Sequence, residues 1–110
     1  MSIQRYLVRG KADQDLEEQA YYLGLNAGAE LGHRFLLAAH ATFALLVEYP
    51  ELGWRLGIVP KRYGVVRVFP VRGLDRILNL YRKTATSIEI LRVVLGSRNL
   101  KHLFRKEGFE

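Results

Sequence analysis

The amino-acid sequence predicts an α+β fold in which a helical hairpin packs on a small, mainly antiparallel sheet. Two observations predict it. Apolar residues recur in steps of three and four between residues 13 and 49, which indicates two consecutive amphipathic helices. Three runs rich in β-branched residues follow in the second half of the chain, separated by turn-forming stretches. Helices and strands grouped in this way along a chain are typical of the α+β class.

With 110 residues, the chain is expected to form a single domain, residues 1–110, around one core. The absence of cysteine excludes disulfides and cysteine–zinc sites and is compatible with a reducing compartment. No apolar stretch approaches the roughly 20 residues that a membrane helix needs, and the first residues lack a secretory signal. We therefore expect a cytoplasmic protein without a membrane segment.

Local signals place the first three elements. Residues 3–9 have the composition of a short strand. Asp13 is the expected N-cap of a first helix that ends near Gly24. Asn26 is the expected N-cap of a second helix, which Pro50 ends. The short connection between the two helices predicts an antiparallel hairpin.

The stretch 50–64 contains three glycines and two prolines and is predicted to be a connecting loop. We expect Trp54 to cover the core while Lys61 and Arg62 stay in solvent. The alternative is that these aromatic and basic side chains stack on bases or follow a phosphate backbone.

The three extended runs are expected to form an antiparallel meander. They comprise residues 65–69, 76–82 and 88–95. If the last turn centres near Ala85, Arg82 pairs with Ile88 and Leu78 pairs with Arg92. A short basic helix is expected after residue 97, which completes the order strand, helix, helix, three strands, helix.

Positive charge is concentrated in the second half of the chain. Residues 1–54 hold 4 Lys/Arg against 7 Asp/Glu, a net charge of −3, whereas residues 55–110 hold 13 against 4, a net charge of +9. This asymmetry indicates an acidic partner, either a nucleic acid or an acidic protein. Each strand of the meander carries one arginine: Arg67, Arg82 and Arg92. Arg92 lies in an apolar row, so it is either buried with a carboxylate partner or functional.

Several kinds of site are excluded by the residues present. No glycine-rich phosphate loop occurs, and the few serines stand at a terminus or in turns, so no serine triad is expected. His33 and His40 are seven residues apart without a third ligand, so packing is expected and no metal or cofactor is implied. The remaining cations suit metal-free RNA cleavage or the binding of an acidic protein.

Taken together, several segments resemble the RelE/ParE superfamily of toxins from type II toxin–antitoxin systems, and most closely its ParE branch. They are residues 12–16, 34–35, 43–46, 49–53, 66–71, 77–82 and 88–100. The resemblance implies a helical hairpin against a small sheet. It also implies growth inhibition by free toxin and a cognate antitoxin that forms a hetero-oligomer with it. ParE-type members act on DNA gyrase, whereas RelE-type members cut mRNA on the ribosome.

The resemblance can be followed residue by residue to a branch. A RelE-type arginine after the last strand matches Arg98, but the tyrosine six residues later is Phe104, which has no hydroxyl for proton transfer. A second RelE-type arginine falls on Leu78. These departures favour a ParE-like, non-enzymatic gyrase inhibitor. A histidine that is common in the ParE branch is Leu95 here, which keeps an inactive, antitoxin-binding homologue as a further alternative.

Each alternative implies its own set of residues. For a ParE-like toxin, the candidates for binding the target or the antitoxin are Arg67, Arg82, Arg92 and Arg98. For a RelE-like ribosome-dependent mRNA endoribonuclease, the candidates for acting on the phosphate are Lys61, Arg67, Arg98 and His102.

Overall fold

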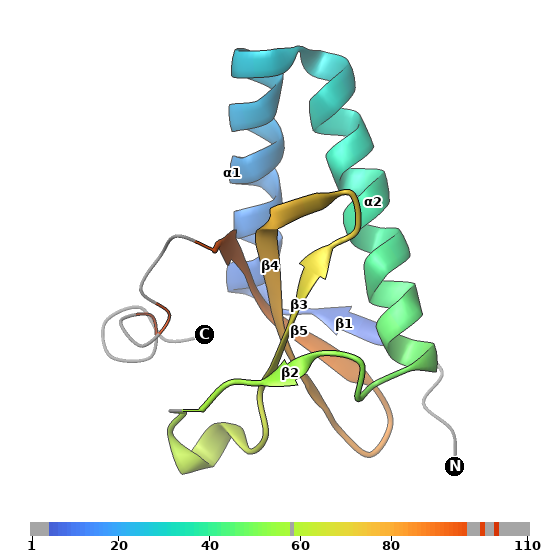
Figure 1. Cartoon of the computed structure of the whole chain (residues 1–110), viewed down its shortest axis with the longest axis vertical. Coiled ribbons are helices and arrows are strands. Elements are labelled where there is room, and N and C mark those ends of the chain that lie inside the picture. Colours follow the sequence, from blue (N-terminus) through green and yellow to red (C-terminus); the bar gives the residue numbers. More distant parts are fainter. Residues whose placement is uncertain (1–4, 58, 97–99, 101–102, 104–110) are drawn as a thin grey trace.

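A computed structural model describes residues 5–57, 59–96, 100 and 103. The predicted α+β class is confirmed, since two helices pack on a five-stranded, mostly antiparallel sheet (Figure 1). Most of the last predicted helix lies outside the described residues, and so do Arg98, His102 and Phe104.

The sheet has the strand order β1-β5-β4-β3-β2. The elements are β1 (Tyr6–Val8), α1 (Gly10–Ala27), α2 (Ala29–Glu48), β2 (Trp54–Arg55), the short 3-10 helix η1 (Lys61–Tyr63), β3 (Arg67–Val71), β4 (Leu74–Lys83) and β5 (Ile88–Leu95). The predicted meander is confirmed as β3, β4 and β5. β1 lies parallel to β5, which the sequence did not predict. The stretch predicted as a plain loop contains β2 and η1.

The hairpin is confirmed, and so is the end of the second helix just before Pro50, since α2 ends at Glu48. The other predicted helix ends are wrong. α1 begins after Arg9, and Asp13 lies in its first turn, where a carboxylate favours the helix dipole. Gly24 and Asn26 both lie inside α1. The break between the helices falls at Gly28, whose φ of 105° is readily adopted only by glycine, and this stronger signal sets the turn.

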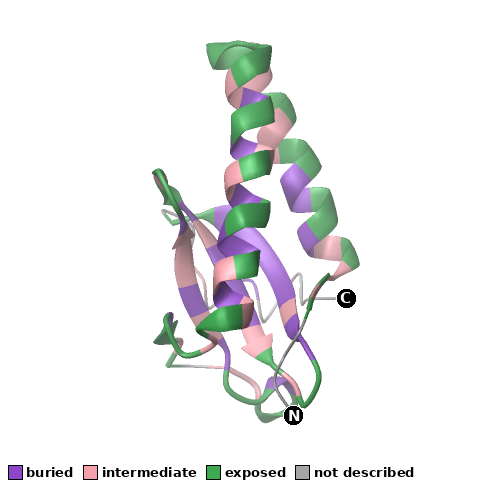
Figure 2. Ribbon diagram, turned by 90° about the vertical axis from the view of Figure 1, so that its right-hand side faces the viewer, coloured by how far each residue is buried: buried purple, intermediate pink, exposed green. Residues whose placement is uncertain are grey.

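The core has two layers, one on each face of the sheet. On the helix side, Phe35, Phe43 and Leu46 of α2 pack with apolar residues of α1, β4 and β5. On the opposite side, Leu103 is fully buried against the sheet beside Leu91. Figure 2 shows that the hairpin is exposed at its tip, beyond the sheet. The sheet is therefore covered on both faces while the hairpin tip is not.

Phe35→Ala should lower the free energy of unfolding by about 3 to 5 kcal/mol, because it leaves a cavity in the fully packed helix-side layer. Leu37→Ala on the same helix is the matched control, since Leu37 is exposed. Urea unfolding of both variants measures the difference. Equal losses for the two variants would mean that Phe35 does not occupy the core.

The observed register between β4 and β5 differs from the prediction. The pairings of Arg82 with Ile88 and of Leu78 with Arg92 are wrong, since Arg92 lies opposite Leu80. Within the described strands, Leu91 has no partner in β4, so β5 contains a β-bulge at this point. Next to the turn the register already differs by one residue from the prediction, since Ile88 lies opposite Lys83. The bulge adds a further shift beyond Tyr81, which turn spacing alone does not reveal.

The bulge in β5 is held by a carboxylate from α1. The Asp15 carboxylate accepts hydrogen bonds from Nε of Arg92 at 2.7 Å and from Nη2 at 3.0 Å. The same carboxylate accepts a third hydrogen bond, from the backbone N–H of Val93, at 2.9 Å. Asp15 and Arg92 are 7% and 3% exposed, so the charges are paired inside the protein. Arg92 thus has the buried carboxylate partner that one of its two interpretations required.

Asp15→Asn should destabilise the fold by about 3 to 5 kcal/mol, because it removes the carboxylate charge that compensates the buried Arg92 guanidinium. Asp13→Asn removes the same charge from an exposed position of the same helix and should cost less than about 1 kcal/mol. Thermal and urea unfolding provide the comparison. If Asp15→Asn were as stable as Asp13→Asn, the ion pair would not hold α1 on the sheet.

Candidate functional site

An open cleft of about 540 Å³ lies where β3 begins and β4 ends, beside η1 and the segment that follows α2. We call this surface the basic cleft. Its charged lining residues are Glu51, Lys61, Arg62, Arg67, Arg82 and Lys83. Five cations thus face a single carboxylate among the described lining residues. A concave surface with this excess of one sign attracts anions and concentrates them locally.

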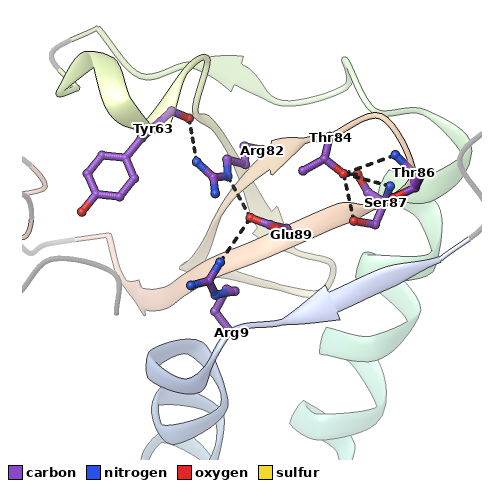
Figure 3. Close-up of polar contacts among 7 residues, drawn as sticks. All are labelled: Arg9, Tyr63, Arg82, Thr84, Thr86, Ser87 and Glu89. Carbon is purple, nitrogen blue, oxygen red and sulfur yellow. Dashed lines mark hydrogen bonds and ion pairs between the residues drawn. The ribbon is translucent and has the colours of Figure 1, made fainter.

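Arg82 is fixed in the cleft by neighbours from two other elements. Its Nε donates to Oε1 of Glu89 on β5 at 2.8 Å, and its Nη1 donates to the backbone carbonyl of Tyr63 at 3.2 Å (Figure 3). Glu89 also lies 3.6 Å from Nη1 of Arg9. The guanidinium of Arg82 is therefore held in place and partly neutralised.

Arg67 is fixed by the segment that follows α2. Its Nη1 donates to the carbonyl of Gly53 at 2.9 Å. The Tyr81 hydroxyl accepts from the N–H of Gly53 at 2.9 Å and donates to the carbonyl of Pro50 at 2.8 Å. A Cβ at Gly53 would lie 2.6 Å from the carbonyl oxygen of Val68, so only glycine allows this close approach.

The other three cations of the cleft are more accessible. The Arg62 guanidinium lies 4.7 Å from the centre of the Tyr63 ring, a cation–π contact that keeps the charge at the surface. The ammonium groups of Lys61 and Lys83 make no hydrogen bond or ion pair within the described part of the chain. These two lysines are free to meet an anion.

The structure brings together three of the residues singled out in the sequence: Lys61, Arg67 and Arg82. The prediction that Arg92 binds the target or the antitoxin is corrected, because its guanidinium is buried with Asp15 and cannot reach a partner's surface. Sequence reasoning missed Lys83, although its position directly after Arg82 at the end of a strand was a usable signal.

The prediction that Trp54 covers the core is also wrong, since its side chain is 52% exposed. Gly53 holds the backbone tightly against β3, and Trp54 lies on the edge strand β2. Tyr63, only 7% exposed, supplies the buried aromatic ring from this part of the chain.

The histidines of α2 lie away from the cleft. Nδ1 of His40 is 2.9 Å from the Tyr6 hydroxyl, and its ring packs edge-on against Phe43. Across residues 5–57, 59–96, 100 and 103, no group of three His, Cys, Asp or Glu side chains could hold a metal ion. None of the helices in these ranges is long and apolar enough to cross a membrane.

The family model described as "ParE toxin of type II toxin-antitoxin system, parDE" matches residues 6–100. The chain belongs to this ParE toxin family. The match spans every strand and both long helices, and it includes all residues of the basic cleft. The resemblance inferred from the sequence is therefore confirmed.

A solved structure titled "Chromosomal ParDE TA system from P. aeruginosa" is similar to this ParE toxin, with a TM-score of 0.67 and 19% sequence identity. The alignment covers 86% of this chain and 96% of that one. The TM-score shows a shared fold, and at this sequence identity the similarity shows the fold alone. A search of curated proteins finds no match.

The stability of this ParE toxin should fall at alkaline pH because of Tyr81. Burial raises the pKa of the Tyr81 hydroxyl above 10.0, although the hydrogen bond with Gly53 and the charge of Arg67 oppose the rise. The folded state then keeps a proton that the unfolded state loses, so this stabilisation is complete below about pH 10 and is lost as the pH rises through the folded pKa.

Tyr81→Phe should remove this alkaline loss and lower stability near neutral pH by about 1 to 3 kcal/mol, because the N–H of Gly53 loses its acceptor. Urea unfolding between about pH 8 and pH 11 measures both effects. Tyr49→Phe is the control at an exposed tyrosine. The assignment fails if the wild type and Tyr81→Phe lose stability in parallel above pH 10.

Proposed function

We propose that this ParE toxin is a non-enzymatic inhibitor of DNA gyrase that blocks growth and is neutralised by a cognate antitoxin in a cytoplasmic hetero-oligomer. The observation that carries the proposal is the match to the ParE toxin family over residues 6–100. The residues of the basic cleft support it further.

The chemistry of the cleft favours binding over catalysis. Its cations could stabilise a charged phosphate, but cleavage also needs a group that moves a proton near neutral pH. No histidine is among the described residues that line the cleft. Tyr63 is buried, and the hydroxyl of Tyr81 is occupied by the segment after α2. These features support an inhibitor in preference to an mRNA endoribonuclease.

A protein partner such as the antitoxin is supported by the surface of the hairpin. Tyr21 and Leu25, near the end of α1, are 70% and 69% exposed. Large apolar and aromatic side chains of this kind commonly anchor protein interfaces. The overall charge of +6 favours an acidic partner for the rest of the surface.

Purified toxin should inhibit supercoiling by DNA gyrase in a concentration-dependent manner, and adding the protein encoded by the adjacent small reading frame should restore it. A parallel reaction contains translating ribosomes and labelled mRNA, which should remain intact. A ribosomal protein of similar charge serves as the control for non-specific effects of a basic protein.

Three results would contradict the proposal. Cuts in the mRNA at the ribosomal A site would support the RelE-like alternative. Normal supercoiling together with intact mRNA would support an inactive homologue that only binds its antitoxin. Equal inhibition by the control protein would mean that the inhibition is a non-specific effect of positive charge.

A further inference from the structure

We propose that the basic cleft binds the phosphodiester backbone of duplex DNA, so that the toxin contacts the DNA held by gyrase as well as the enzyme. The choice of DNA among polyanions rests on the proposed gyrase target. The existence of an anion site rests on the cleft itself.

The first argument is the charge of the cleft. Glu51 is the single carboxylate among the described residues that line the cleft. Glu89, which does not line the cleft, forms an ion pair with Arg82. Lys61, Arg62 and Lys83 remain without a carboxylate partner in the described structure. Duplex DNA carries one negative charge per about 1.7 Å of its length, so a groove with several uncompensated cations suits it.

The second argument is the way in which the cations are held. Arg67 uses one guanidinium nitrogen on the carbonyl of Gly53, and Arg82 is fixed by Glu89 and the carbonyl of Tyr63. A guanidinium has five N–H donors, so donors remain on both arginines for a phosphate. Fixed arginines and free lysines from separate segments give a preorganised surface that can follow a backbone.

The third argument separates DNA from an acidic polypeptide. A protein interface needs apolar anchors at its centre. Among the described residues that line the cleft, Val65 is the large hydrophobic side chain that is substantially exposed. The large exposed aromatic residues lie outside this lining: Tyr21 and Tyr22 are on α1, while Tyr49 and Trp54 flank the segment after α2 without lining the cleft. The cleft therefore suits a polyanion that is read through its charge.

The test compares two pairs of substitutions that remove the same charge. Lys61→Gln with Lys83→Gln changes the free cations of the cleft. Arg34→Gln with Arg72→Gln changes exposed cations on α2 and in the turn between β3 and β4. All four side chains are exposed, so both double variants should fold, which circular dichroism and thermal unfolding verify.

Fluorescence anisotropy with a labelled DNA duplex, from about 50 to 200 mM salt, gives the affinity and its salt dependence. The cleft pair should bind at least about tenfold more weakly at low salt and lower the slope of log Kd against log salt by about 2. The control pair should keep the wild-type slope. Equal effects of the two pairs, or no binding of DNA by the wild type, would overturn the proposal.

Two competitors distinguish the source of the anion. Single-stranded RNA and polyglutamate are added at equal charge concentration to the complex of toxin and labelled duplex. DNA should remain bound more tightly than both. Displacement by either competitor at lower concentration than unlabelled duplex would assign the cleft to RNA or to an acidic polypeptide and would overturn the DNA assignment.

A supercoiling assay separates this inference from the proposed function. The cleft pair should need at least about tenfold more toxin than the wild type to inhibit gyrase, whereas the control pair should not. Equal potency of cleft pair and wild type would overturn the inference and leave gyrase inhibition standing. A wild type that leaves gyrase active would contradict the proposed function. The slopes of log Kd against log salt would still test whether the cleft binds DNA.

Discussion

The ion pair between Asp15 and Arg92 is the interaction on which the arrangement of this protein depends. One carboxylate of α1 compensates a buried guanidinium and accepts the N–H of Val93, directly beyond the β-bulge. β5 lies between β1 and β4, so the same contact fixes the hairpin relative to the strands on both sides. A buried charge of this kind is costly without its partner, which ties the position of α1 to the irregularity in β5.

The ion pair also distinguishes the structural arginine from the candidate binding residues. Arg92 is buried with Asp15 of α1, whereas Arg82 reaches the cleft beside Tyr63. Arg67 lines the same cleft and is held there by its hydrogen bond to the carbonyl of Gly53. Three arginines that look equivalent in the sequence thus lie in two different environments. The family match includes all three, and the accessible cations of the cleft are the ones available to a partner.

Periodicity predicted the hairpin and the meander because it reports which face of an element is buried. It did not predict the register of β5, because Ile88 pairs with Lys83 instead of Arg82 and a bulge follows at Leu91. The residues after the bulge, Arg92 and Val93, bind Asp15, which is far away in the sequence. The exposure of Trp54 depends on the contact of Gly53 with β3, which is equally non-local. Lys61 and Arg67 could be named from charge and strand position. Lys83 offered the same signal directly after Arg82, but only the folded chain shows that it lines the same cleft as Lys61.

Hydrogen–deuterium exchange of the toxin, free and bound to gyrase with DNA, tests the central claim most directly, namely that the basic cleft is the contact surface and the Asp15 ion pair is structural. Binding should slow exchange in residues 50–55, 61–67 and 82–84, which surround the cleft. Exchange around Asp15 and Val93 should be slow in both states. Protection confined to the hairpin tip, with unchanged exchange around the cleft, would contradict the account.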